Sequence, residues 1–315
     1  MTDTTTSTGL APGGTGPLAR RTAARVGYGA MQLERHHADP DSGIAVLRRA
    51  IELGIDHIDT AHFYADGFVN SLIRSVMGDA NLLIATKVGA VPDPGGPRPL
   101  KPAQKPAELR AGVEENLRSL GVDSIPLVNL RRMEIGPGLA ATGDQKVDLD
   151  DQLAEMISMR DEGKIGSIGL SAVVTNTVRR ALPAGIACVQ NPYNLIDRRF
   201  EDLLNLCADN GIAWVPFFPL GSAFEAFPNV TDNPVVQQVA ADAGITPSQA
   251  GLAWLLSHAE NTFLIPGTGS IRHLEENTAV GSIQLSSPAL KALDAVGADT
   301  VSIPVEPPVW PGETR

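Results

Sequence analysis

Cysteine, aromatic residues and long apolar runs are all scarce in this chain of 315 residues. The two cysteines, Cys188 and Cys207, both lie in apolar stretches and have no zinc-ligand spacing. We therefore expect two buried thiols in a reducing cytoplasm and no disulfide scaffold. No run is long and apolar enough to cross a bilayer, and Arg20-Arg21 is not followed by the apolar segment of an export signal.

Positive charge is also in short supply. The chain has 25 Lys and Arg against 36 Asp and Glu, a formal net charge of −11. Nucleic acid and anionic membrane need clustered basic residues, so neither is expected as a partner. Adjacent histidines on a loop seldom converge on one ion, so His36-His37 is not interpreted as a metal site, and no metal is expected. The chain is 43% hydrophobic and 19% charged, which is typical of a folded globular protein.

Short β-branched or apolar runs alternate with helical patterns along most of the chain. We expect eight strands, at Arg25–Met31, Ile55–Asp59, Leu82–Thr86, Ile125–Leu130, Ser167–Leu170, Ala187–Gln190, Ala213–Pro216 and Thr262–Ile265. This rhythm, without a linker between halves, predicts an α/β fold of the (β/α)8 TIM-barrel class. A doubly wound sheet is the alternative, but Val26–Met31 lacks the G-x-G-x-x-G turn that it requires.

The segments between the expected strands show helical spacing and helix boundaries. Val46, Leu47 and Ala50 form one apolar face, and Gly54 is a plausible stop signal. Residues 246–249, Thr-Pro-Ser-Gln, form a capping box with proline at the first helical position. A helix is therefore predicted to begin there.

The expected domain organisation is a single barrel over residues 23–298. Residues 1–22 are predicted to be a flexible N-terminal tail, with a small cover of the barrel as the alternative, and residues 299–315 an irregular C-terminal tail. Two long loops, Val91–Pro106 and Arg132–Lys146, follow the third and fourth strands. In barrels such loops fold over the C-terminal face, where substrates bind.

Polar residues gather where the expected strands end. Asp59 ends the second strand, Tyr64 lies five residues later, and Lys87 follows the third strand. The ends of the next three strands also carry polar residues: Arg131, Ser171 and Gln190. Strand ends in a barrel share one rim, so these side chains are expected to form one site.

The residues Asp59, Tyr64 and Lys87 indicate a proton donor. A free tyrosine has a pKa of about 10, and a neighbouring ammonium, held in place by a carboxylate, lowers it. Tyr64 would then protonate a carbonyl oxygen. Two other interpretations of Lys87 stay open: a structural lysine, or the nucleophile of a Schiff-base enzyme.

The last strand leads into a turn rich in Gly, Thr and Ser. Residues 266–270, Pro-Gly-Thr-Gly-Ser, precede a helical segment at 274–277. Backbone N–H groups and hydroxyls at a helix N-terminus bind phosphate, although a plain capped turn has the same composition. Phe217 and Phe218 follow the seventh strand and belong either to the core or to a surface that stacks on a flat ring.

These motifs resemble the aldo-keto reductase family in order and spacing. Asp59–Tyr64 resembles its D-T-A-x-x-Y signature, Ala85–Lys87 its strand-three lysine, and Val189–Asn194 and Ile265–Asn277 its cofactor segments. The similarity runs from about residue 25 to residue 295. Within the family the chain looks most like a bacterial branch that includes pyridoxal reductase.

The resemblance implies a role for each matching residue. Tyr64 would be the general acid, and Lys87 and Asp59 would tune it. The cofactor would be NADPH, with NADH less favoured. It would contact Gly29, Met31, Ser171, Gln190, Phe217, Phe218, Pro219, Leu220, Gly221, Pro266, Gly267, Thr268, Gly269, Ser270, Arg272, Glu276 and Asn277. The substrate pocket would include His62, Phe63 and Trp310.

Two positions depart from the family pattern. Arg131 stands where most members have a catalytic histidine, and Ala172 stands where asparagine often follows Ser171. Arg131 is interpreted as a hydrogen-bond donor to the substrate oxygen, as a selector of anionic substrates, or as part of a structural ion pair. These alternatives stay open at this stage.

The expected function is therefore NAD(P)H-dependent reduction of an aldehyde or ketone to an alcohol. The substrate is expected to be pyridoxal-like or, failing that, a carbonyl intermediate of secondary metabolism. A non-catalytic, nucleotide-binding redox-sensing subunit is the alternative, and the oligomeric state is left open.

Overall fold

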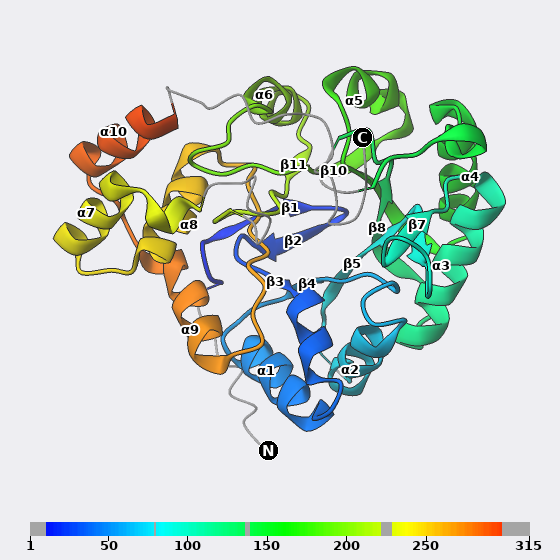
Figure 1. Cartoon of the computed structure of the whole chain (residues 1–315), viewed down its shortest axis with the longest axis horizontal. Coiled ribbons are helices and arrows are strands. Elements are labelled where there is room, and N and C mark those ends of the chain that lie inside the picture. Colours follow the sequence, from blue (N-terminus) through cyan, green and yellow to red (C-terminus); the bar gives the residue numbers. More distant parts are fainter. Residues whose placement is uncertain (1–10, 79, 136–138, 222–228, 298–315) are drawn as a thin grey trace, which may run out of the picture.

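A closed parallel barrel forms the centre of the molecule in the computed structural model, which describes residues 11–78, 80–135, 139–221 and 229–297 (Figure 1). Seven strands pair in the order β11-β10-β9-β8-β5-β4-β3. Their bounds are β3 Tyr28–Gly29, β4 His57–Asp59, β5 Leu83–Val88, β8 Ile125–Arg131, β9 Ile165–Ser171, β10 Ile186–Gln190 and β11 Ala213–Trp214.

The eighth stave is an extended segment joined to its neighbours by isolated bridges. Thr262 pairs with Trp214 on one side, while Leu264 pairs with Val26 and Gly267 with Gly29 on the other. These parallel bridges link the two edges of the seven-stranded sheet. The predicted (β/α)8 barrel is confirmed, although its eighth strand is held by bridges and not by a continuous ladder.

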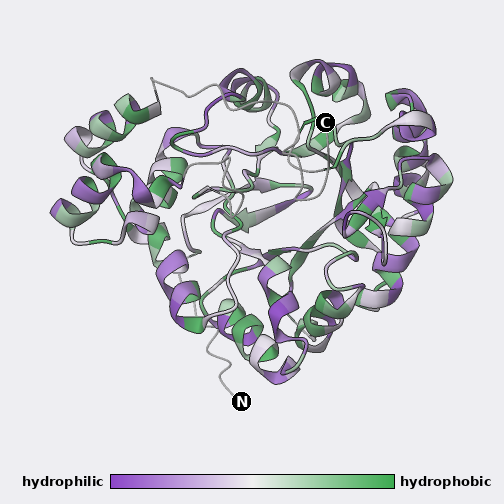
Figure 2. Ribbon diagram, viewed as in Figure 1, coloured by the Kyte–Doolittle hydropathy of each residue, from purple (hydrophilic) through white to green (hydrophobic). Residues whose placement is uncertain are grey.

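Helices surround the barrel, one after each stave (Figure 1). They are α1 Pro40–Glu52, α2 Phe68–Met77, α3 Pro106–Leu120, α4 Leu149–Asp161, α5 Thr175–Ala181, α6 Glu201–Asp209, α8 Pro247–His258 and α9 Ile271–Ala279. Two further helices, α7 Pro234–Ala243 and α10 Ser287–Val296, pack on each other beside α8. Figure 2 shows that the outer helices carry both hydrophilic and hydrophobic residues, as expected for helices with one face on a barrel. No helix within the described ranges could span a membrane.

The core has two parts because strand side chains alternate between the two faces of a sheet. The larger part lies between the strands and the helices. The smaller fills the barrel interior, and includes Leu83, Ala85, Leu127, Cys188 and Phe263. The inward residues that follow these at the strand ends lie at the open mouth of the barrel.

The N-terminal end of the barrel is closed by a hairpin that the sequence does not predict as secondary structure. Strands β1 (Thr15–Leu18) and β2 (Arg21–Ala24) pair antiparallel, and Leu18 and Ala23 join the interior cluster. The expected flexible tail is therefore wrong for residues 15–22, and the alternative of a small cover describes them. The local sequence gives little indication of strands here, and the hairpin is stabilised by burial of Leu18 and Ala23 in the barrel floor. Residues 1–10 lie outside the described part of the chain.

The two long loops are partly ordered. Residues 91–106 contain most of a second hairpin, β6 Ala90–Pro92 with β7 Leu100–Pro102, and the start of α3. Residues 132–146 contain the short 3₁₀ helix η2, Gly143–Gln145. Another 3₁₀ helix, η1 (Ala30–His36), follows β3. The expected C-terminal tail, 299–315, lies outside the described residues.

Candidate active site

The alternation of strand side chains brings the predicted site residues to one level of the barrel. Lys87 lies two residues beyond the interior Ala85, and Gln190 two beyond the interior Cys188. Ser171 pairs with Arg131 on one side and with Gln190 on the other. All of these side chains point inward at the mouth, as predicted from the strand ends.

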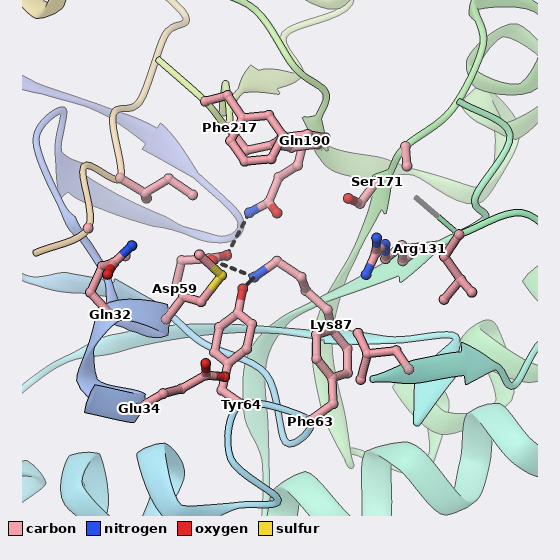
Figure 3. A pocket seen from close by; sticks show the side chains of 18 of the residues that line it. Gln32, Glu34, Asp59, Phe63, Tyr64, Lys87, Arg131, Ser171, Gln190 and Phe217 are labelled. Atoms are coloured by element: carbon pink, nitrogen blue, oxygen red, sulfur yellow. Dashed lines mark hydrogen bonds and ion pairs between the residues drawn. The ribbon is translucent and has the colours of Figure 1, made fainter. Parts of the chain in front are cut away.

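A continuous polar chain links four of these residues (Figure 3). The Lys87 ammonium donates to Asp59 Oδ1 at 2.5 Å, to the Thr60 carbonyl at 3.0 Å and to the Tyr64 hydroxyl at 3.2 Å. On the other side, Gln190 Nε2 donates to Asp59 Oδ2 at 2.7 Å. The side chains of Lys87 and Asp59 are only 10% and 4% exposed, so solvent screens their interaction little.

The electrostatics of Tyr64 differ from the sequence-based expectation in one respect. Lys87, as expected, and also Arg131 push the pKa of Tyr64 down, but burial outweighs them and the pKa lies above its ordinary value. Burial also disfavours the charge of Lys87, yet Asp59 and Tyr64 outweigh it and raise the pKa of Lys87. The phenol is thus protonated and the amine charged at neutral pH.

A cavity of about 840 Å³ opens above the polar chain of Asp59, Lys87, Tyr64 and Gln190. It is lined by Gly29, Met31, Pro266, Gly267 and Asn277, and also by residues of the two long loops. Its floor is formed by the residues of the polar chain, with Arg131 and Ser171 beside it, and by Phe217. The size suits an organic ligand, and the polar groups converge on one wall.

The expected cofactor residues divide into two groups. Those that line the cavity are Gly29, Met31, Ser171, Gln190, Phe217, Phe218, Pro219, Leu220, Gly221, Pro266, Gly267 and Asn277. Those that do not line it are Thr268, Gly269, Ser270, Arg272 and Glu276.

The second group forms the turn and first helical residues beyond the cavity rim. The Thr268 carbonyl accepts from the Tyr28 hydroxyl at 2.5 Å, and Thr268 Oγ1 accepts from the Ser270 N–H at 3.0 Å. Arg272 is 72% exposed and pairs with Glu276 at 2.8 Å on the surface of α9. These residues can contact only a part of a ligand that extends out of the cavity.

Two features of the cavity wall are unusual for a plain barrel interior. The Oε1 atom of Gln190 is buried and has no hydrogen-bond partner among the described residues. Ala172, one of the two residues that depart from the family pattern, has φ = 54°, in the left-handed region that asparagine and glycine tolerate better than alanine. Orphaned polar atoms and backbone strain of this kind concentrate at ligand sites.

The three expected substrate-pocket residues have different outcomes. Phe63 lines the cavity. His62 does not: its Nε2 lies 3.6 Å from Glu115 of α3. The expectation for His62 is corrected accordingly. Trp310 lies outside the described residues.

Several cavity residues were not identified from the sequence. Arg98, Leu100, Ile135 and Leu139 come from the two loops that were expected to cover the mouth, so the loops pointed to their region but not to the individual side chains. Other lining residues that were missed include Gln32, Glu34, Ala65 and Asp66, from η1 and the turn after Tyr64.

Comparison with known proteins gives a family and several relatives. The Aldo/keto reductase family matches residues 25–298. The chain is 40% identical to a pyridoxine 4-dehydrogenase of Escherichia coli, over 90% of this chain and 98% of the relative. It is 36% identical to an uncharacterised oxidoreductase of Schizosaccharomyces pombe, over 87% of this chain and 86% of the relative.

Solved structures agree with this assignment. An aldo/keto reductase of Klebsiella pneumoniae, in complex with NADP and acetate, superimposes with a TM-score of 0.74 at 25% identity, over 90% of this chain and 95% of its own. The family resemblance is confirmed, as is the similarity to a pyridoxal reductase-like branch.

Proposed function

The chain belongs to the aldo/keto reductase family, and on that basis we propose that it reduces the carbonyl group of an aldehyde to an alcohol with NADPH, using Tyr64 as the proton donor. The observation that carries the proposal is the Asp59–Lys87–Tyr64 chain at the floor of the cavity, with Lys87 3.2 Å from the Tyr64 hydroxyl.

The proton donor must be protonated when substrate binds and must tolerate the negative charge left after the transfer. Burial keeps the Tyr64 phenol protonated by raising its pKa, which meets the first condition. The charged Lys87 and Arg131 both stabilise the tyrosinate form, which meets the second. Burial of Tyr64 therefore favours the protonated state before the transfer, and the charges of Lys87 and Arg131 favour the tyrosinate after it.

The residues of the cavity fit a nicotinamide cofactor. Gln190 Oε1, buried and without a partner in the described residues, can accept from the carboxamide of a nicotinamide. Phe217 supplies an aromatic face beside it (Figure 3). When bound there, the cofactor supplies hydride to the carbonyl carbon, and Tyr64 supplies the proton to the oxygen.

The preference for NADPH over NADH rests on Arg272. This cation stands in the first turn of α9, next to the Gly- and Ser-rich turn that leaves the cavity. A helix N-terminus with an arginine suits a phosphate monoester, such as the 2′-phosphate that distinguishes NADPH. The complex of the Klebsiella pneumoniae relative with NADP supports the same choice.

The leading substrate class is a pyridoxal-like aromatic aldehyde. The Escherichia coli relative is named for oxidation of pyridoxine, which is pyridoxal reduction in reverse. A carbonyl intermediate of secondary metabolism is the second choice. A Schiff-base mechanism is less well supported, because an amine nucleophile must be uncharged, and Asp59 keeps Lys87 protonated.

The proposal is tested first by ligand binding. Fluorescence titration of the purified protein with NADPH and NADH is expected to show binding of both, with NADPH the tighter. Arg272→Gln is the matched variant: it should weaken NADPH binding by about tenfold, the loss of one charge-assisted hydrogen bond, and leave NADH binding unchanged. Equal loss for both dinucleotides would contradict the role of Arg272.

Turnover is then measured as loss of NADPH absorbance with pyridoxal and a panel of other aldehydes and ketones. Steady reduction of at least one aldehyde is expected, with the alcohol as product. A protein that binds NADPH tightly but turns over none of the panel would favour the redox-sensing alternative over the reductase.

A further inference from the structure

Arg131 is a positive charge that lies outside the hydrogen-bonded chain of Asp59, Lys87, Tyr64 and Gln190. It is the last residue of β8 and lies across from Ser171, so its side chain points into the mouth of the barrel. Figure 3 shows its guanidinium in the cavity beside Ser171, separate from the dashed contacts that join Lys87, Asp59, Tyr64 and Gln190.

The guanidinium of Arg131 has no hydrogen bond or ion pair within the described ranges, whereas its sequence neighbour is fully engaged. Arg132 donates to Glu134 at 2.6 Å and also binds Gln152. The Asp59 carboxylate, which also lies in the active site, already accepts hydrogen bonds from Lys87 and Gln190. The structural ion pair considered for Arg131 from the sequence is therefore absent among these residues.

Leaving a charge desolvated and unpaired is costly. Burial lowers the pKa of Arg131, which reports the same unfavourable environment. The other cavity carboxylates are Glu34 and Asp66, and Figure 3 shows Glu34 on the far side of Tyr64 from Arg131. A partner that enters with the ligand would relieve the cost.

We propose that Arg131 binds an anionic oxygen that the substrate carries close to its carbonyl group. The inference rests on the proposed reductase function, because it takes the carbonyl oxygen to lie at the Tyr64 hydroxyl. Arg131 is near enough to Tyr64 to act on it electrostatically. A group held by both residues is therefore a carbonyl with an oxyanion only a few bonds away.

Apart from Arg98, the residues of the two long loops that line the cavity are apolar. Leu100, Ile135, Leu139 and Phe63 line it, and three of them pack in one cluster with Ala90. The substrate is therefore an aromatic or aliphatic body with one oxyanion beside its aldehyde. Two chemical sources fit: a carboxylate, which a guanidinium binds through two parallel hydrogen bonds, and a phenolate adjacent to the aldehyde carbon. Pyridoxal itself belongs to the phenolate class.

The proposal is tested with two pairs of aldehydes that differ in charge. 2-Carboxybenzaldehyde is compared with its methyl ester, and 2-hydroxybenzaldehyde with 2-methoxybenzaldehyde, at a pH where the phenol is ionised. The wild-type protein is expected to favour the anion by about ten- to a hundredfold in kcat/KM in at least one pair, the value of a hydrogen-bonded charge. The pair that shows the preference identifies the source of the oxyanion.

Arg131→Met and Arg131→Lys are the matched variants. The anion-to-neutral ratio of kcat/KM should fall to about one in Arg131→Met, mainly through a higher KM for the anion, and should be partly kept in Arg131→Lys. An unchanged ratio in Arg131→Met, or no preference in the wild type, overturns the proposal. A guanidinium that only activates the carbonyl would lower both members of a pair equally.

A binding measurement separates this proposal from the proposed function. Benzoate and benzamide are titrated calorimetrically into the NADP-saturated wild type and into Arg131→Met. Benzoate should bind the wild type at least tenfold more tightly than benzamide, and the difference should vanish in the variant. If benzoate shows no such advantage and neither aldehyde pair depends on Arg131, the oxyanion site is wrong even if aldehydes are reduced. If it does while no aldehyde is reduced, only the reductase function fails.

Discussion

At the scale of single residues, the active site combines burial with charge. Tyr64 is more strongly affected by burial than by Lys87, so its pKa rises although a cation touches it. The sequence identified Lys87 and Asp59 as the partners of Tyr64 but predicted a lowered pKa, the opposite of the net shift. Strand-end positions predict which side chains meet, whereas the degree of desolvation depends on the loops above them.

Burial acts in the same direction on every tyrosine of the chain. The pKa of Tyr28 is raised by burial, and that of Tyr193 by burial and by the carboxylate of Glu201. Near pH 10, where about half of an exposed tyrosine is ionised, the folded protein should show almost no tyrosinate absorbance, and the urea-unfolded protein should show all three groups ionising.

The raised pKa values of the tyrosines make the free energy of unfolding depend on pH in one direction. A group whose folded pKa exceeds its unfolded pKa stabilises the fold fully below the unfolded value and loses that contribution as the pH rises. The free energy of unfolding should therefore be constant up to about pH 9 and then fall. Tyrosinate absorbance that appears at pH 10 before any loss of structure would contradict the burial of these groups.

At the scale of elements, sequence signals worked best where the cause is local. The capping box at 246–249 is present at the start of α8. Thr246 Oγ1 accepts from the Gln249 N–H at 3.1 Å, and Gln249 Oε1 accepts from the Thr246 N–H at 3.0 Å. The face of Val46, Leu47 and Ala50 on α1 is buried as expected. Capping and periodicity need only neighbouring residues, so one sequence is sufficient to reveal them.

The capping box gives a testable energy. Thr246→Ala removes one of its two reciprocal contacts and should lower the free energy of unfolding by about 1 kcal/mol, with no effect on NADPH binding. Urea unfolding followed by circular dichroism measures it as a lower midpoint with an unchanged slope. Thr246→Ser, which keeps the hydroxyl, is the control and should remain within about 0.5 kcal/mol of the wild type. Equal loss in both variants would assign the effect to the methyl group.

Elements stabilised by distant partners were harder to predict. The β1–β2 hairpin is held by Leu18 and Ala23 in the barrel floor, and its β2 end by Asp56, whose Oδ1 accepts from the Ala24 N–H at 2.9 Å. Nothing in residues 11–24 alone predicts those contacts. The β6–β7 hairpin likewise contains prolines that indicate a loop, and it forms where the chain folds over the mouth.

At the scale of the whole molecule, barrel topology made the site predictable. Parallel strands place their C-terminal ends on one rim, so residues as distant in sequence as Asp59 and Gln190 come within 2.7 Å of each other. The residues that were missed, such as Glu34 and Leu139, come from segments whose path depends on tertiary packing. His62 likewise lies beside Glu115 of α3 and does not line the cavity, and that contact joins residues far apart in the sequence.

Donation of the proton by Tyr64 during carbonyl reduction can be examined in the variant Tyr64→Phe. The variant removes one hydroxyl and keeps the ring that packs against Phe63. We predict that kcat for aldehyde reduction falls by at least about 10²-fold, while the dissociation constant for NADPH stays within about twofold of the wild type. Turnover that remains at the wild-type rate with unchanged NADPH binding would rule out Tyr64 as the proton donor.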